Sequence, residues 1–343
     1  MPTKLVRHAL SGPTMGARWS AIVHCSPECD PAPLRAALAA AVGEIDRQMS
    51  PRAPSSDLSR LNRAAPGAWV EVPAHMLTVL EAGLEIGRAS DCAFDIGMGD
   101  AVAAWGFSGQ EADPDRICAA LGARRRPAHE VLEIDGGTGR VRKHAPIAID
   151  LCGIAKGYGV DRLAETARSF GIAHALLAID GELRALGNQP GDQTGGRPWV
   201  IGVERPDPDH RAAHSVLTLA DGSVATSGDY RHRIELAGAR FSHIMDPDRG
   251  APLLASSQSA TVVAATCMQA DAWATAMLVL GRDRGLRLAR DLGLSVLFLA
   301  QGDGLPEVCG AGPVFERGAG AGRDGFVAAA PLLQNPFTAS RSA

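Results

Sequence analysis

Two oxygen-bearing side chains stand four residues apart in the stretch QADAWATAMLVLG. Asp271 and Thr275 fall on a helical pattern, so both oxygens project from one face near the beginning of the predicted helix. A carboxylate and a hydroxyl are hard ligands that suit Mg²⁺, which binds few protein groups and keeps water and phosphate oxygens in its remaining positions. Alternatively, Asp271 favours the helix N-terminus and Thr275 hydrogen-bonds a backbone carbonyl.

A glycine-rich stretch, DLCGIAKGYGVD, runs from Asp150 to Asp161. It follows an apolar stretch at 146–149 that predicts a short strand, and it leads into a helical pattern. Its glycines at 153, 157 and 159 allow close approach of the backbone, and amides at the start of a helix suit an anion. The stretch predicts either a site for a phosphate-bearing ligand or tight packing at a strand-to-helix corner. It matches neither GxGxxG nor the Walker loop.

A histidine precedes the turn signal in FSHIMDPDRG. His243 stands three residues before Asp246, which begins the turn sequence DPDRG. Histidine is the side chain best suited to move a proton near neutral pH, and an exposed loop is a usual place for such a group. The alternative is a structural histidine in a turn.

A third stretch, SVATSGDYRHR, offers hydroxyls and backbone amides in what the sequence predicts to be a tight turn. Thr226, Ser227 and Gly228 are its central residues. These groups suit a phosphate or a ribose, and they equally suit the capping of a strand end.

The chain around these motifs contains both helical and strand patterns. Helical periodicity covers residues 34–49, 76–87, 267–280 and 286–292. Strand patterns cover residues 19–24, 131–134, 140–143, 175–179, 199–203, 216–219, 233–236, 261–265 and 295–299. Successive strands in the second half connect more often by hairpins than by helices. We therefore predict an α+β fold with a mostly antiparallel sheet flanked by helices.

Composition is that of a globular enzyme, with 46% hydrophobic and 21% charged residues in a chain of 343. A net charge of −4 and the lack of long basic runs argue against a nucleic-acid partner. The sequence shows neither a secretory signal nor an apolar run long enough for a transmembrane segment, which predicts a cytoplasmic protein. Seven scattered cysteines predict buried thiols rather than disulfides or a zinc site.

The length allows one large domain or two ordinary ones. We predict a single catalytic domain over residues 1–310, with room for two subregions. The remaining residues, 311–343, are rich in glycine and alanine and form a weakly patterned C-terminal tail.

Seven stretches taken together resemble, in order and spacing, the FAD:protein FMN transferases, formerly known as thiamine-biosynthesis lipoproteins. The likeness covers about residues 15 to 300. The stretches are MSPRAPSSDLSRLN (Met49–Asn62), CAFDIGMGDAVAAWGF (Cys92–Phe107), DLCGIAKGYGVD, IDGELRALG (Ile179–Gly187), VATSGDYR, FSHIMDPDRGAP and ADAWATA.

The resemblance implies an activity. Members of this family bind FAD with Mg²⁺ and transfer FMN through a phosphoester bond to a threonine of a target protein, releasing AMP. The target threonine lies in a motif of the form D-x-x-[ST]-G-A-[ST]. A flavin-transferase-like fold with an FAD cleft between two subregions is implied as well.

Two other activities compatible with such a site are a Mg²⁺-dependent FAD pyrophosphatase that yields FMN and AMP, and a non-catalytic FAD-binding protein. The chain has no match to the acceptor motif, and the stretch from Asp192 to Gly196 has the wrong spacing. The acceptor is therefore expected to be another protein. Many relatives are exported and lipid-anchored, which implies a periplasmic location if the chain was trimmed.

The resemblance also assigns site residues. It places the metal ligands at Asp271, at Thr275 and at the backbone carbonyl of Ala155, with Ala274 adjacent, and it makes His243 the candidate for proton handling at the threonine hydroxyl. The FAD-contacting positions are Met15, Arg52, Ala93, Phe94, Asp95, Cys152, Tyr158 and Met245.

Three positions depart from the usual pattern of this family. Arg52 stands where an aromatic residue is common, which implies a cationic contact in place of stacking. Cys152 replaces the usual glycine or serine, and Asp180 replaces the first glycine of a Gly-Gly pair.

Overall fold

The fold is built on a large sheet with helices on one face. The computed structural model describes residues 5–109, 111–191, 196–207, 209–230, 233–236, 238–254, 258–301, 306–316 and 326–328. The stretch from Asp192 to Gly195, considered above as part of an acceptor-like sequence, lies outside the described residues.

Eight strands form the large sheet, and every neighbouring pair is antiparallel. In spatial order they are β1 (Val6–Thr14), β2 (Ala17–Cys25), β6 (His174–Ile179), β7 (Glu182–Leu186), β10 (Gly222–Gly228), β14 (Gln258–Ala264), β15 (Ser295–Ala300) and β16 (Glu307–Ala311). The prediction of an α+β fold with a mostly antiparallel sheet is confirmed.

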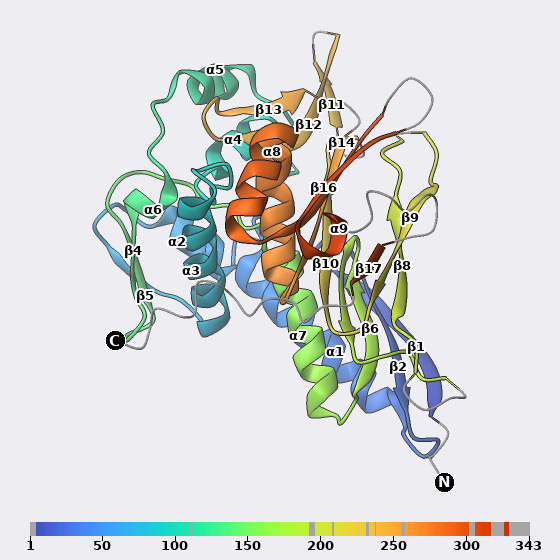
Figure 1. Ribbon diagram of the computed structural model, residues 1–343. Coiled ribbons are helices and arrows are strands. Elements are labelled where there is room, and N and C mark those ends of the chain that lie inside the picture. The colour runs from blue at the N-terminus through green and yellow to red at the C-terminus, as the bar shows by residue number, and fades with distance from the viewer. Residues whose placement is uncertain are drawn as a thin grey trace.

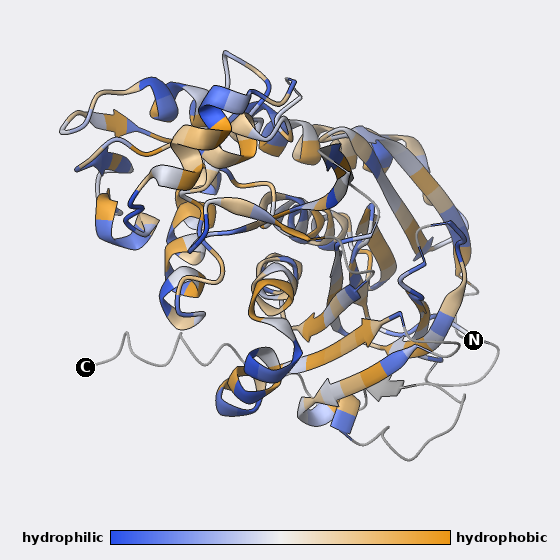
Figure 2. Ribbon diagram, turned by 90° about the horizontal axis from the view of Figure 1, so that it is seen from above, coloured by the Kyte–Doolittle hydropathy of each residue, from blue (hydrophilic) through white to orange (hydrophobic). Residues whose placement is uncertain are grey.

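Three long helices cover one face of this sheet (Figure 1). They are α1 (Pro31–Met49), α7 (Ala155–Ser169) and α8 (Cys267–Leu292). Each buries an apolar stripe, as Leu34, Leu38 and Val42 do in α1. Gly281, with φ of 71°, interrupts α8 close to the predicted break between two helices. Seen from above, the strands curve around centrally placed helices (Figure 2).

A second, smaller sheet covers the opposite face. Its strands, in order, are β17 (Phe326–Ala328), β9 (Ala213–Leu219) and β8 (Trp199–Glu204), and the helix α9 (Gly312–Phe315) packs beside them. Phe315 is 2% exposed in the cluster between the sheets. The packed core thus extends past residue 310, where the sequence predicted the tail to begin.

The remaining elements lie beside and above α8 (Figure 1). Helices of this region are α2 (Asp57–Arg63), α3 (Ala74–Ala89), α4 (Gly99–Ala104), α5 (Pro114–Gly122) and α6 (Ala128–Val131). Two small antiparallel sheets contain β3 (Trp69–Glu71), β5 (Arg140–Lys143) and β4 (Leu132–Asp135), and β11 (Arg233–Leu236), β12 (Ala239–Asp246) and β13 (Ala251–Leu254). None of the helices within the described ranges is long and apolar enough to cross a bilayer.

One predicted strand is absent. Residues 146–149 do not form a ladder, because their backbone groups bond elsewhere. Ile149 donates its amide to Asn62 Oδ1 and accepts from Asn62 Nδ2, and the Ala148 carbonyl accepts from the Gly99 amide. A single asparagine side chain therefore takes the place of a neighbouring strand.

One predicted turn is instead a strand, and another is confirmed. The central residues of SVATSGDYRHR lie in β10, where pairing with the distant strands β7 and β14 overrides the local turn preference of serine and glycine. The predicted turn DPDRG forms at the end of β12, with the Gly250 amide donating to the Asp246 carbonyl at 2.9 Å. All seven cysteines are free thiols, as predicted, but only Cys25 and Cys267 are buried.

Candidate functional site

The carboxylate of Asp271 lies against the glycine-rich corner at the start of α7. Its Oδ2 accepts a hydrogen bond of 2.9 Å from the backbone amide of Gly157. The residue that precedes α7, Ile154, makes no side-chain capping bond, so Asp271 caps α7 from the neighbouring helix. The predicted anion at this helix N-terminus is thus, at Gly157, a carboxylate of the protein itself.

Thr275 lies one turn further along α8 and faces the same corner. Its Oγ1 is 3.0 Å from Ser227 Oγ of β10. A Cβ added at Gly153 would lie 3.4 Å from Thr275 Oγ1 and 3.2 Å from the Phe94 ring, so Gly153 leaves room between them. The hydroxyls of Ser227 and Thr275 therefore meet beside the glycines, which confirms that Asp271 and Thr275 share one face.

Gly157 allows α7 and α8 to approach closely. A Cβ at this position would lie 2.3 Å from the Cys267 carbonyl oxygen and 2.7 Å from Asp271 Cβ. Two backbones this close leave no space for a methyl group.

We expect Gly157→Ala to lower the free energy of unfolding by about 1–3 kcal/mol through overpacking, despite the higher helix propensity of alanine. Urea denaturation measures this change. The control is Gly122→Ala, at the end of α5, where an added Cβ meets nothing within 4 Å. Equal stability of the two variants would contradict the close approach.

A buried charge cluster lies beneath the corner. Lys156 Nζ forms a 2.7 Å ion pair with Glu182 Oε1, and the other carboxylate oxygen of Glu182 is buried without a hydrogen bond. Burial and the nearby Asp271 carboxylate raise the pKa of Glu182 to about 7. Burial also raises the pKa of Asp271, and Lys156 opposes this shift. Burial alone would lower the pKa of Lys156, but Glu182 and Asp271 raise it overall. The cluster thus contains two buried carboxyl groups, of Glu182 and Asp271, and one lysine, Lys156, to neutralise them.

The raised pKa of Glu182 predicts a pH-dependent contribution to stability. Below about pH 4.5 the side chain is protonated in both the folded and the unfolded protein. Between pH 4.5 and about 7 the unfolded chain loses this proton and the folded chain retains it, so stability falls as pH rises. Relative to Glu182→Gln, the parent should lose up to about 3 kcal/mol across this window.

Urea denaturation of the parent and of Glu182→Gln at pH 4.5 and pH 7.5 measures this loss. Glu165→Gln, which changes an exposed carboxylate of α7, is the control. An identical pH dependence in the parent and in Glu182→Gln would contradict the raised pKa.

Met15 and Arg52 lie beside the same end of α7. Met15 has φ of 48° in the turn between β1 and β2, and a Cβ at Gly159 would lie 3.1 Å from Met15 Cε. A Cβ at Gly16 would lie 3.5 Å from Arg52 Nη1, which places that guanidinium against the same turn. Two of the predicted FAD-contacting positions are thereby adjacent to each other.

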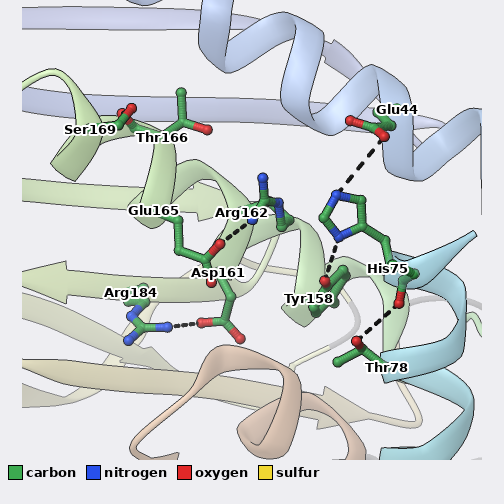
Figure 3. A network of polar contacts seen from close by, with 11 residues as sticks. Glu44, His75, Thr78, Tyr158, Asp161, Arg162, Glu165, Thr166, Ser169 and Arg184 are labelled. Atoms are coloured by element: carbon green, nitrogen blue, oxygen red, sulfur yellow. Dashed lines mark hydrogen bonds and ion pairs between the residues drawn. The ribbon is translucent and has the colours of Figure 1, made fainter. Parts of the chain in front are cut away.

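Cys152 lies in the loop before α7, and Tyr158 lies in the first turn of α7. Cys152 is an exposed residue, and desolvation together with the nearby Asp150 carboxylate raises the pKa of its thiol well above the usual value. Tyr158 is buried, and its hydroxyl lies 2.8 Å from His75 Nδ1 on α3 (Figure 3).

His75 is a residue that the sequence interpretation missed. Its Nε2 lies 3.9 Å from Glu44 Oε1 of α1, so His75 connects Tyr158 of α7 to α1 and α3 (Figure 3). His75 and Tyr158 are 83 positions apart in the sequence, so no local sequence pattern predicts their contact.

The segment Ala93-Phe94-Asp95 is buried or half-buried beside the corner. Phe94 faces Gly153, as described above. Asp95 accepts from the amide of Gly97 in its own loop at 2.8 Å and from the amide of Ala128 at the start of α6 at 3.1 Å. Burial raises the pKa of Asp95, and these two amides oppose the shift. The described contacts of Asp95 thus shape the loop that holds Phe94.

His243 and Met245 lie on β12, which packs against α8. Their strand carries a register shift between Phe241 and Met245, and His243 is half-exposed within it. Met245 is buried in a separate cluster with Met98 and Trp105 rather than beside the glycines. The prediction that His243 lies in an exposed loop is wrong, because the strand pairing extends to Asp246.

Comparison with known proteins shows the family of this chain. The model of the ApbE family matches residues 15–298. The chain belongs to the ApbE family. It is 36% identical over 299 residues to an FAD:protein FMN transferase of Vibrio cholerae, covering 86% of this chain and 87% of that one. It is 31% identical to the FAD:protein FMN transferase of Escherichia coli K12, over 85% of this chain and 84% of that one.

Solved structures of ApbE proteins share the fold. The flavin transferase ApbE from Vibrio cholerae aligns with a TM-score of 0.77 and 32% identity, over 90% of this chain and 97% of that one. The ApbE protein of Thermotoga maritima aligns with a TM-score of 0.76 and 28% identity, over 89% and 97% of the two chains.

The donor atoms at the corner fit a hard cation. The buried Asp271 carboxylate and the Thr275 hydroxyl lie together, and the excess buried carboxylate of the cluster favours an added positive charge. Ala274 is fully buried and has no side-chain oxygen, so the side-chain oxygens in this part of α8 are those of Asp271 and Thr275. Within the described ranges, no group of three or more His, Cys, Asp and Glu side chains could hold a metal by itself.

One departure from the usual ApbE-family pattern has a backbone explanation. Asp180 has φ of 52°, in the left-handed region that favours glycine, at the turn between β6 and β7. A glycine would relax this turn. The aspartate adds a carboxylate close enough to raise the pKa of Lys156 further.

Proposed function

We propose that this protein transfers FMN from FAD to a threonine of a separate acceptor protein, releasing AMP. The observation that carries the proposal is the position of Asp271 and Thr275 against the glycine corner of α7. Membership of the ApbE family and the named activity of its relatives support the same activity.

The metal ligands in this proposal are the Asp271 carboxylate, the Thr275 hydroxyl and the backbone carbonyl of Ala155. A Mg²⁺ ion bound there would neutralise charge on the diphosphate of FAD. Lys156 offers a further positive charge next to this corner, although Glu182 already pairs with it. Positioning and charge neutralisation are the main demands of phosphoryl transfer, and these residues meet both.

His243 is the proposed general base. Its imidazole accepts the proton of the acceptor hydroxyl, and the hydroxyl oxygen attacks the phosphorus of the FMN half. The bond between that phosphorus and the bridging oxygen of the diphosphate breaks, and AMP leaves with that oxygen. The products are a threonine–FMN phosphoester and AMP.

The acceptor in this proposal carries the motif D-x-x-[ST]-G-A-[ST]. FAD is bound in a cleft between two subregions of the chain, lined by the predicted contact positions Met15, Arg52, Phe94, Cys152 and Tyr158.

The test combines the purified chain, FAD, Mg²⁺ and a small protein that carries D-x-x-T-G-A-T. The expected result is a fluorescent flavin band at the mass of the acceptor after denaturing electrophoresis, with AMP in equal amount. An acceptor with alanine in place of the threonine is the control and should remain dark. Release of AMP without acceptor would indicate a pyrophosphatase, and FAD retention without turnover would indicate a binding protein. Either result would overturn the proposed function.

A further inference from the structure

The helices α7 and α8 cap each other. Asp271 of α8 accepts from the Gly157 amide of α7, as described above. In return, Asp161 of α7 accepts from the first two amides of α8, with its Oδ1 2.9 Å from Cys267 N and its Oδ2 2.9 Å from Met268 N. Each helix supplies a carboxylate to amide groups that its partner leaves unpaired.

Asp161 completes the N-terminus of α8. The next amide, of Gln269, donates to the side chain of the N-cap residue Thr266, and the Ala270 amide donates to the Thr266 carbonyl. The first two amides have Asp161 as their partner. Without this carboxylate, two buried or half-buried donors at the start of α8 would be left unsatisfied.

The large sheet holds Asp161 in place. Arg184 of β7 forms an ion pair with its Oδ1, and both side chains are largely buried, at 14% and 6% exposed (Figure 3). Glu182 lies two residues earlier on β7, on the same face, and pairs with Lys156. β7 therefore contacts α7 through two ion pairs, one near Gly157 and one at Asp161.

The metal ligands proposed above are divided between these two helices. Ala155 lies in the first turn of α7, and Asp271 and Thr275 lie in the second and third turns of α8. Mg²⁺ accepts only near-octahedral geometry at about 2.0–2.1 Å, so a small shift of one helix along the other weakens its binding. The close contact at Gly157 limits the distance between the helices, and their position along each other is set by the Gly157–Asp271 hydrogen bond and by the two bonds of Asp161.

We propose that Asp161, held by Arg184, is a positioning residue of the metal site. It fixes the N-terminus of α8 on α7 and so sets the distance from the Ala155 carbonyl to Asp271 and Thr275. This inference rests on the proposed function, because it takes those three residues as the ligands. Asp161 itself touches neither metal nor substrate.

The test is Asp161→Asn, which keeps the size of the side chain but removes its charge and one acceptor oxygen. The probe is Mn²⁺ alone, titrated into the protein and followed by the electron paramagnetic resonance signal of the free ion. We expect the Kd for Mn²⁺ to rise about 10- to 100-fold, as for other residues that orient metal ligands. The Mg²⁺ concentration for half-maximal transfer should rise in parallel, with kcat at saturating Mg²⁺ within about 3-fold of the parent.

Glu165→Gln is the matched control. It makes the same acid-to-amide change one turn further along α7, at a half-exposed carboxylate that pairs with Arg162 of its own helix. Its Kd for Mn²⁺ should equal that of the parent. All titrations are made well below the melting temperature of each variant, so a loss of stability alone does not change the Kd.

A folded Asp161→Asn with lowered melting temperature and the Kd of the parent would overturn the inference. If Asp161→Asn does not fold, Arg184→Gln leaves the carboxylate in place without its anchor and should shift the Kd in the same direction, by a smaller factor. An unchanged Kd in that variant would overturn the inference. A parent that binds no Mn²⁺ overturns the metal site and the positioning role together. A parent that binds Mn²⁺ but fails to label the acceptor overturns only the proposed function, and the ratio of variant to parent Kd still decides the role of Asp161.

Discussion

Replacing Asp271 by asparagine is expected to abolish FMN transfer, lowering the rate by about 10³-fold or more while the protein remains folded. A metal ion at a phosphoryl-transfer site contributes several kcal/mol of charge stabilisation, and about 4 kcal/mol corresponds to 10³-fold in rate. Asparagine retains an oxygen that can accept from the Gly157 amide, so the cap on α7 is kept. What is lost is the negative charge that attracts the cation.

Stability should respond in the opposite sense. Asp271 is 4% exposed, and burial raises its pKa, which means that the folded protein holds this charge at a cost. In the absence of metal, Asp271→Asn should unfold at the same temperature as the parent or at a higher one. If the Asp271 carboxylate instead stabilised the fold, Asp271→Asn would unfold at a lower temperature than the parent.

Asp291→Asn is the control, since it makes the same change at an exposed position in the last turn of α8. The measurements are the flavin-transfer assay, Mn²⁺ titration and thermal unfolding without metal. Equal transfer activity of Asp271→Asn and the parent would refute the metal assignment.

The local part of this site could be predicted from sequence. Asp271 and Thr275 are four residues apart in a strongly apolar helix, and helical geometry alone places them on one face. The glycines of the α7 corner are also a local signal: a Cβ at Gly157 would collide with α8, and one at Gly153 would lie tightly against the Phe94 ring. The sequence left open whether these glycines serve a ligand or packing, and Gly157 serves packing against α8.

The partners of these residues could not be predicted, because they come from distant parts of the chain. Asp161 meets the amides of Cys267 and Met268 more than 100 residues later. The ion pair of Lys156 with Glu182 depends on how β7 lies under α7. The sequence shows only that Glu182 follows the Asp-Gly turn of IDGELRALG. That position does not indicate that the partner of Glu182 is Lys156.

The sequence prediction failed where a short polar segment joins a sheet. SVATSG contains serine and glycine, whose local preference is for turns. Pairing of β10 with both β7 and β14 outweighs that preference. His243, which precedes the turn DPDRG, likewise lies in a strand, β12, rather than in a loop. These differences matter for the mechanism, because a strand holds Ser227 and His243 more firmly than a loop would.

The position of His243 on β12 favours a positioned base. Ile244 packs in the central cluster with Trp273, and the next residue, Met245, packs in the separate cluster with Trp105. A regular strand sends successive side chains to opposite faces, and the register shift between Phe241 and Met245 adds a local bend. Bends of this kind often re-aim a side chain next to an active site. His243 directly precedes these two anchored residues and remains half-exposed.

His243→Ala should therefore lower kcat for transfer by about 10²- to 10⁴-fold, the usual contribution of a general base. The Kd for Mn²⁺ should stay at the parent value, because His243 is not among the proposed ligands. In the parent, kcat should rise with pH as the imidazole loses its proton, and this rise should be absent from the variant. Added imidazole should restore part of the rate, since the side chain is half-exposed and leaves an accessible space. His210→Ala, at a side chain 82% exposed, is the control. A variant that keeps the pH dependence of the parent and gains nothing from imidazole would exclude His243 as the base, whatever its residual rate.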